Sequence, residues 1–319
     1  MKLGLAGDTM LGRRVAAAIA ERGPQSLVGE DVVEVAREAD LLVLNLECCI
    51  SERGAPWPDP RKPFFFRAPP AAVEALTLLG VDCVTLANNH AVDFGVEALL
   101  DTFEHLQAAG IEWVGAGPDR ERARAPVVLE KAGFRLTVLG CCDHPAEYAA
   151  GPDSPGVAYG LEWVPQAVEQ ADSDGVLVAP HWGPNMAPRP LRSLRRWAAT
   201  FRDAGASLVA GHSAHVFHGV EARVLYDLGD FLDDYAVDRK LRNDLGLLFL
   251  VDLDREGPSR LEAVPLKLEY CHTRMATGRD AQWVARRFRE ACGEFGTEVA
   301  VEGDRLVVTW RSAAQPPAG

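Results

Sequence analysis

Two histidines, His212 and His215, lie three residues apart directly after a short apolar run. The run at 207–210 ends in Gly211 and is typical of a buried strand, so both histidines fall on the loop beyond it. Loops at the carboxyl ends of parallel strands are where open α/β sheets bind ligands. Imidazole binds zinc, iron and manganese, which makes the pair a candidate metal-binding element. A surface or capping role fits the pair equally well, so the other strand ends must decide.

Four other apolar runs, at about 2–6, 40–46, 81–86 and 175–179, also end in potential metal ligands. The side chains that follow them are Asp8, Glu47, Asn89 with His90, and His181. Each has an ordinary alternative, and Asp8 alone fits a helix N-cap. Burial of Glu47 after so apolar a run, however, requires a compensating positive charge. Five such endings favour a metal centre, because carboxylate, amide and imidazole form the mixed ligand set of zinc, manganese or iron.

A long loop at 51–69 is rich in proline, arginine and aromatic residues. Long loops in compact domains are often functional. Its cations Arg61, Lys62 and Arg67 are candidate contacts for an anionic substrate, with solvated surface charge as the alternative.

Composition limits the class of protein and its partners. The chain has 319 residues, of which 48% are hydrophobic and 25% charged, which is typical of a globular protein. A net charge of −13 disfavours nucleic acid as a partner, whereas an anionic small molecule or polymer stays possible because bound metal ions reverse the local sign of the charge.

No run approaches the roughly 18–20 apolar residues of a membrane span. The N-terminal segment reaches Asp8 too early for a signal peptide, and seven cysteines in no disulfide pattern favour free thiols. We therefore expect a cytoplasmic protein without membrane or nucleic-acid partners.

Alternating strand and helix patterns predict an α/β fold. We expect one domain over 1–274, with 246–253 and 259–268 as antiparallel edge strands, and an extension over 275–319. The extension is predicted to contain a helix at 281–292 and a hairpin around 302–304, and we expect the last seven residues to fray.

Six motifs along residues 1–270 together resemble one family. In order they are Gly7-Asp8-Thr9-Met10, Asn45-Leu46-Glu47, Ala87-Asn88-Asn89-His90-Ala91-Val92-Asp93-Phe94-Gly95, His181-Trp182-Gly183, Gly211-His212-Ser213-Ala214-His215-Val216 and Tyr226-Asp227-Leu228-Gly229-Asp230-Phe231. This set resembles the CapA family, which is named for poly-γ-glutamate capsule biosynthesis and is similar to calcineurin-like metallophosphatases. The resemblance implies an αββα sandwich of two mixed sheets, with the site at the strand ends.

The resemblance also implies roles, with one or two manganese, zinc or iron ions per chain. Glu47 would bridge two ions. The other implied ligands are Asp8 and His215 for one ion, and Asn89, His181 and His212 for the second. His90 would contact substrate and protonate the leaving group, with Asp93 orienting it. Asn45 and Asn88 are further candidate substrate contacts, beside Arg61, Lys62 and Arg67.

The chain departs from the family pattern at several positions. Met10 stands where metallophosphatases have a histidine ligand, so the first ion would have only three protein ligands. Ala91 replaces an aspartate common in phosphatases. Asp230 and Asn185 stand where relatives often have asparagine and glutamate, respectively.

Two functions follow from this pattern. One is a hydrolase that cleaves a phosphoester, or an amide or γ-glutamyl bond, through metal-activated water. The other is a metal-stabilised component that binds an anionic polymer during its assembly without catalysis. We favour the hydrolase, because a direct capsule role is expected to need a membrane anchor or an export signal, and the sequence shows neither. The sequence does not separate phosphoester cleavage from amide or γ-glutamyl chemistry.

Overall fold

Strand β1 (Lys2–Thr9) is buried from its second residue to its last and lies in the middle of the larger of two β-sheets. It pairs in parallel with β2 (Leu41–Leu46) on one side. On the other side, β16 (Leu245–Asp254) runs antiparallel along the first half of β1, and β15 (Asp230–Leu232) runs parallel at its end. Strands that are buried on both faces of a sheet have nearly continuous apolar sequences, rather than alternating apolar and polar residues.

The computed structural model describes residues 1–310, and the two main sheets contain most of their strands. The larger sheet adds β5 (Cys83–Thr85), β6 (Glu112–Val114), β17 (Gly257–Glu269), β18 (His272–Met275), β19 (Ala300–Glu302) and β20 (Arg305–Thr309). The smaller sheet contains β8 (Val127–Lys131), β9 (Phe134–Cys142), β11 (Gly175–His181), β12 (Leu208–Ala210), β13 (Val220–Glu221) and β14 (Val224–Leu225). Two minor sheets pair β3 (Cys49–Ile50) with β4 (Arg67–Ala68), and β7 (Ala116–Gly117) with β10 (Gly156–Val157).

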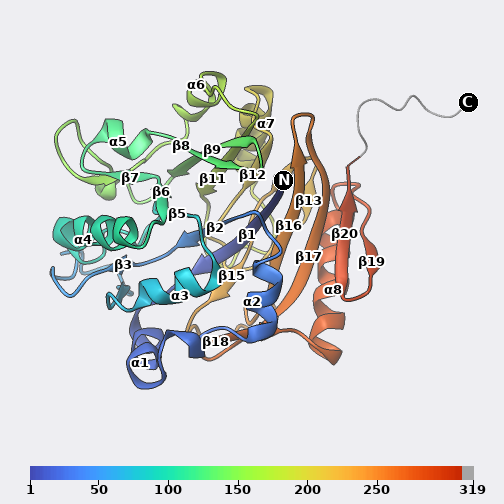
Figure 1. The fold of residues 1–319 in the computed structure, drawn as a ribbon, viewed down its shortest axis with the longest axis horizontal. Helices are drawn as coiled ribbons and strands as arrows, with labels where there is room; N and C mark the ends of the chain where they lie inside the picture. The colour runs from blue at the N-terminus through green and yellow to red at the C-terminus, as the bar shows by residue number, and fades with distance from the viewer. Residues whose placement is uncertain (311–319) are drawn as a thin grey trace, which may run out of the picture.

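Helices cover the outer faces of both sheets (Figure 1). Those beside the larger sheet are α1 (Arg13–Arg22), α2 (Glu30–Ala36), α3 (Ala72–Leu79) and α4 (Gly95–Ala108). Those near the smaller sheet are α5 (Arg120–Arg124), α6 (Val164–Glu169) and α7 (Arg192–Asp203). The predicted αββα sandwich of two mixed sheets is therefore confirmed.

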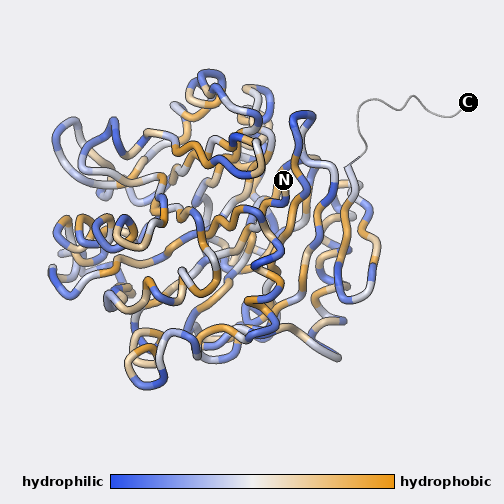
Figure 2. Tube along the Cα trace, viewed as in Figure 1, coloured by the Kyte–Doolittle hydropathy of each residue, from blue (hydrophilic) through white to orange (hydrophobic). Residues whose placement is uncertain are grey.

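Apolar side chains fill the space between these layers. Leu5 and Val43 of the larger sheet share one core with Val138 and Leu177 of the smaller sheet. Separate cores lie under α1–α4 and under α6 and α7. Figure 2 shows the same arrangement, because the central strands are the most hydrophobic segments and the connecting loops the most hydrophilic. All seven cysteines are buried and unpaired, as expected.

The C-terminal segment joins the larger sheet. Helix α8 (Gly278–Gly293) packs Val284 and Phe288 into the core between the sheets, and β20 pairs with β17. The predicted helix and hairpin are thus present, while the division at 275 stays a prediction. The prediction of edge strands is wrong, because β16 lies between β1 and β17, and β17 lies between β16 and β20. The last seven residues lie outside the described range. Among residues 1–310, no helix has the length and apolar character needed to cross a membrane.

Candidate metal centre

The carboxyl ends of five strands from both sheets meet at one place. Asp8 lies in β1 and His181 ends β11. Glu47 follows β2, Asn89 lies on the loop after β5, and His212 lies on the loop after β12. Within the smaller sheet, a parallel bridge between His181 and His212 holds the ends of β11 and β12 side by side. Asp8, Glu47 and His181 are each no more than 1% exposed. Asp8 is not a helix cap, because α1 begins after Gly12.

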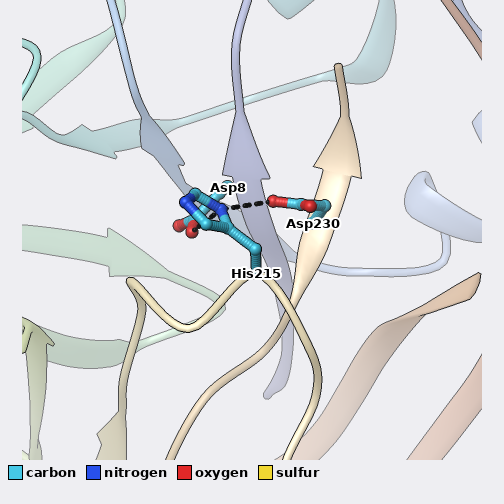
Figure 3. Close-up of side chains that lie close together, drawn as sticks. All are labelled: Asp8, His215 and Asp230. Carbon is cyan, nitrogen blue, oxygen red and sulfur yellow. Dashed lines mark hydrogen bonds and ion pairs between the residues drawn. The ribbon is translucent and has the colours of Figure 1, made fainter. Parts of the chain in front are cut away.

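Two groups of potential ligand atoms share Asp8. One ligand atom from each of Asp8, Glu47 and His181 lies within 4.8 Å of the others, and the same holds for Asp8, His215 and Asp230. Figure 3 shows the second group, in which His215 contacts both carboxylates. Its Nδ1 lies 2.8 Å from Oδ1 of Asp230 and 3.3 Å from Oδ2 of Asp8. His212 approaches the same carboxylate, with Nδ1 3.1 Å from Oδ1 of Asp8.

Several buried polar atoms of this cluster have no hydrogen-bond partner among residues 1–310. They are Oε1 of Glu47, Oδ1 of Asn89, Nε2 of His181 and Nδ1 of His212, the last of which lies 3.1 Å from Oδ1 of Asp8 but not in hydrogen-bond geometry. Leaving such an atom unpaired in a protein interior costs about 1–3 kcal/mol, so native structures rarely contain several together. All four are lone-pair donors of the types that bind manganese, iron or zinc. The residues present therefore fit a divalent cation.

The ionisation of the cluster indicates the same need for positive charge. Burial acts to raise the pKa of Asp8, but its contacts with His212 and His215 hold that pKa well below the usual range. Burial raises the pKa of Glu47 to about 8. Burial alone would lower the pKa of His215, yet the neighbouring Asp230 and Glu47 raise it well above the ordinary value. Without a cation, protons on Glu47 and His215 thus supply the charge that the carboxylates require.

Two asparagines hold the strand ends in register. Asn45 donates from Nδ2 to Oδ1 of Asp8 at 2.8 Å, and Asn88 donates from Nδ2 to Oδ1 of Asn45 at 3.0 Å. The backbone N–H of His90 in turn donates to Oδ1 of Asn88 at 3.0 Å. Both asparagine side chains are fully buried in the protein's own hydrogen bonds. Contact with a substrate stays a prediction for them and would require these bonds to break.

His90 and Asp93 form a buried pair beside the cluster. Nδ1 of His90 lies 2.6 Å from Oδ2 of Asp93, and the ring of Phe66 stacks on the imidazole with a centroid distance of 3.9 Å. Asp93 also accepts from the backbone N–H of Phe66 at 2.7 Å and from the hydroxyl of Tyr148 at 3.0 Å. Burial lowers the pKa of His90 to about 4, although Asp93 opposes the shift.

The three predicted cations of the long loop lie in different surroundings. Lys62 is largely buried, and its Nζ lies 2.9 Å from Oδ1 of Asp93 and donates to the carbonyl oxygen of Asn89 at 2.8 Å. Arg61 pairs with Asp59 on the surface, and its side chain is 84% exposed. Arg67 donates to the carbonyl oxygen of Arg53 at 2.8 Å. Of the three, only Lys62 is placed in contact with the His90–Asp93 pair, and substrate contact stays a prediction for all of them.

Residues that sequence reasoning did not assign to the site also surround it. Asp230 contacts His215, and the hydroxyl of Tyr235 donates to Oε2 of Glu47 at 3.1 Å. Tyr148 reaches Asp93 from a distant loop. In the sequence, Asp230 is marked only by its departure from the family pattern. Three acids lie close together at 230–234, but their burial is visible only in the structure.

The fold is the metallophosphatase-like αββα sandwich that the sequence predicts, and it is similar to that of a solved phosphatase. Over 84% of this chain and 93% of the other, the structure is similar to that of a phosphatase from Mycoplasma pneumoniae, with a TM-score of 0.52 and 13% sequence identity. At this identity the similarity shows the fold alone.

Sequence comparisons identify the family. Residues 2–235 match the model of the bacterial capsule synthesis protein PGA_cap family, and the chain belongs to that family. It is 31% identical over 297 residues to a probable polyglutamine synthesis accessory protein of Mycobacterium tuberculosis, covering 84% of this chain and 76% of that protein. It is 27% identical over 271 residues to the PGA biosynthesis protein CapA of Bacillus subtilis, covering 82% of this chain and 70% of that protein. The expected resemblance to CapA proteins with a calcineurin-like fold is confirmed.

Proposed function

We propose that this protein is a metal-dependent hydrolase that binds one or two divalent transition-metal ions and acts on a phosphoester or a related anionic substrate. The observation that carries the proposal is the set of buried, unpartnered ligand atoms at the shared strand ends. The proposed ligands are Asp8, Glu47 and His215 around one ion, and Glu47, Asn89, His181 and His212 around the other. Bound there, the ions would act as Lewis acids that lower the pKa of water and stabilise negative charge on oxygen.

His90 supplies the proton in this proposal. Asp93 fixes the ring by holding Nδ1, and Nε2 has no hydrogen-bond partner within residues 1–310. With its pKa lowered to about 4 by burial, the free ring is neutral at pH 7. A bound anionic ester would favour the imidazolium, so His90 would take up a proton with the substrate and pass it to the leaving oxygen.

A second candidate is a non-catalytic role in the assembly of an anionic polymer. The names of the relatives favour it, because they describe a polyglutamine synthesis accessory protein and a PGA biosynthesis protein. Hydrolysis of an amide or γ-glutamyl bond is a variant of the first proposal, since the same metal chemistry serves a carbonyl centre.

Metal analysis of the purified protein, followed by assays on phosphomonoesters, phosphodiesters and γ-glutamyl amides with added Mn²⁺, Zn²⁺ or Fe²⁺, tests the hydrolase. His212→Ala should lose metal and turnover together, whereas His105→Ala, which removes a half-buried histidine on α4, should keep both. A wild-type protein that binds none of these ions contradicts the proposal. A metal-loaded protein that cleaves none of these substrates favours the assembly role.

A further inference from the structure

The side of the metal centre around His215 lacks one side chain. Met10 stands two residues after Asp8, but it is fully buried and its sulfur accepts the backbone N–H of Gly12 at 3.0 Å. The thioether is therefore used within its own turn. A thioether is also a soft ligand that suits manganese and iron poorly. Without another group, this side has only Asp8, Glu47 and His215.

Asp230 lies where a further ligand would be needed. Strand β15 runs parallel to β1, and its first residue, Asp230, is the register partner of Asp8. Registered residues on adjacent strands point to the same face of a sheet, so the two carboxylates lie side by side. Asp230 is 2% exposed, and its second oxygen, Oδ2, has no hydrogen-bond partner within the described residues 1–310. Two adjacent buried carboxylates require a cation between or beside them.

In the present geometry, His215 occupies that position. Its Nδ1 lies within 3.3 Å of an oxygen of each carboxylate, as Figure 3 shows. Both acids and the histidine thus converge on one point, with ligand atoms within 4.8 Å of one another. A small rotation of the imidazole would admit an ion in contact with all three side chains.

We propose that Asp230 is a direct ligand of the ion on the His215 side and takes the place left by Met10. The inference rests on the proposed metal-dependent function and specifies that site further. The ion would then be held by carboxylates from Asp8, Glu47 and Asp230 and by one imidazole. Oxygen-rich sets of this kind suit manganese and iron better than zinc. The opposite side has two imidazoles, so it suits zinc as well as it suits manganese or iron. The two sides of the centre would therefore prefer different metals.

Asp233 offers the strongest alternative for the free oxygen of Asp230. Burial raises the pKa of Asp233 to about 6, and an interaction with Asp230 acts against that shift. If the two carboxyls simply shared a proton, Asp230 would orient His215 without touching the ion. Removal of such an outer partner typically weakens metal binding by about 10–100-fold and leaves the number of bound ions unchanged.

Manganese binding to the metal-depleted full-length chain, measured by equilibrium dialysis with elemental analysis, separates these cases. We expect two ions in the wild type and one in Asp230→Ala, which leaves no side-chain oxygen at this position. The matched control is Asp234→Ala, which removes a buried charge four residues away that pairs with Arg13, and it should keep both ions. Two ions in Asp230→Ala overturn the proposal while leaving the hydrolase standing. A wild type that binds none contradicts both.

Cobalt spectroscopy provides a second measurement that does not depend on ion counting. In Asp230→Cys, a direct ligand at this position produces a thiolate-to-cobalt charge-transfer band when Co²⁺ is added. The native cysteines are buried and unpaired, so the wild type supplies the baseline, and Asp234→Cys should match that baseline. Absence of the band in an Asp230→Cys protein that still binds cobalt overturns the proposal.

Discussion

The metal centre and the His90–Asp93 pair are neighbours with opposite hydrogen-bonding states. In the metal centre, atoms such as Oε1 of Glu47 and Nε2 of His181 are buried without a hydrogen-bond partner in the described part of the chain. Asp93, by contrast, receives four donors, from His90, Phe66, Lys62 and Tyr148, all within 3.0 Å. One region is complete only with a cation, and the other is complete from the protein alone.

The two regions should therefore differ in how far they depend on a bound ion. Buried carboxylates without a counter-charge destabilise the folded state, so the metal centre gains stability from any ion that binds the native protein. The saturated Asp93 holds His90 in place whether or not an ion is bound. Preorganised groups of this kind need no rearrangement during a reaction. Changes to the first region should therefore alter metal content, and changes to the second should leave it intact.

Glu47→Gln should have the largest effect. Loss of the proposed bridging carboxylate removes the ions, and turnover should fall about 10³-fold or more, because metal ions contribute several kcal/mol to the transition state. The folded metal-free variant should be about as stable as the metal-free wild type, since burial raises the pKa of Glu47 to about 8 and the amide replaces a mostly uncharged carboxyl. Elemental analysis and thermal unfolding with and without Mn²⁺ measure both effects. If Glu47→Gln kept the metal content of the wild type, the metal centre and the His90–Asp93 pair would not differ in their effect on metal binding, and the comparison would fail.

Asp93→Asn should reduce turnover by about 10²-fold while the metal content stays at the wild-type value. It should also lower the free energy of unfolding by about 3 kcal/mol, because Lys62 loses its buried partner. Steady-state assays, elemental analysis and urea unfolding provide the readouts. A loss of metal equal to that in Glu47→Gln would show that the two regions act as one.

Metal affinity should rise with pH up to about 8. Burial raises the pKa of Glu47 to about 8 in the metal-free protein, so below that pH an ion must displace a proton. The affinity for Mn²⁺ should fall at least about tenfold per pH unit from 8 to 6.5, because His215, whose pKa is also raised, must release a proton as well, and calorimetric titration can measure this slope. His90→Gln should show the same slope, since it leaves Glu47 in place. A flat profile between pH 6.5 and 8 would contradict the protonated state of Glu47.

Tyr148→Phe should have the smallest effect. It removes one of the four donors to Asp93, so stability should fall by about 1 kcal/mol and turnover by a few-fold, with metal content unchanged. Tyr159→Phe is the matched control, because Tyr159 makes no side-chain hydrogen bond within residues 1–310. Equal effects of the two substitutions would mean that the hydroxyl of Tyr148 does not support Asp93.

The αββα fold and the meeting of strand ends could be predicted because buried parallel strands leave a strong signal. Each forms a continuous apolar run, and whatever follows the run lies at the carboxyl edge of the sheet. The structure brings Asp8, Glu47 and His181 together in this way. The edge-strand prediction was wrong because neither sequence reveals that β16 pairs with β1 or that β20 adds to β17 later in the chain.

Asp230 and Tyr148 could not be assigned from local sequence. Strand β15 has only three residues, and its pairing with β1 joins positions 222 residues apart. Tyr148 reaches Asp93 across 55 residues of chain from a loop. Contacts between residues so far apart in the sequence depend on how the layers of the fold pack together. Lys62 shows the same limit, since nothing in its sequence distinguishes its buried pairing with Asp93 from the surface pairing of its neighbour Arg61.

The central position of β1 has a consequence for synthesis on the ribosome. Its residues pair with β2 within about 40 positions, but also with β15 and β16 more than 220 positions further along. Such non-local pairing slows folding. Asp8 can therefore meet Asp230 only after most of the chain has emerged from the ribosome. Strand β1 is synthesised first, but it cannot pair with β15 until then. An ion bound earlier than that would find only part of its site.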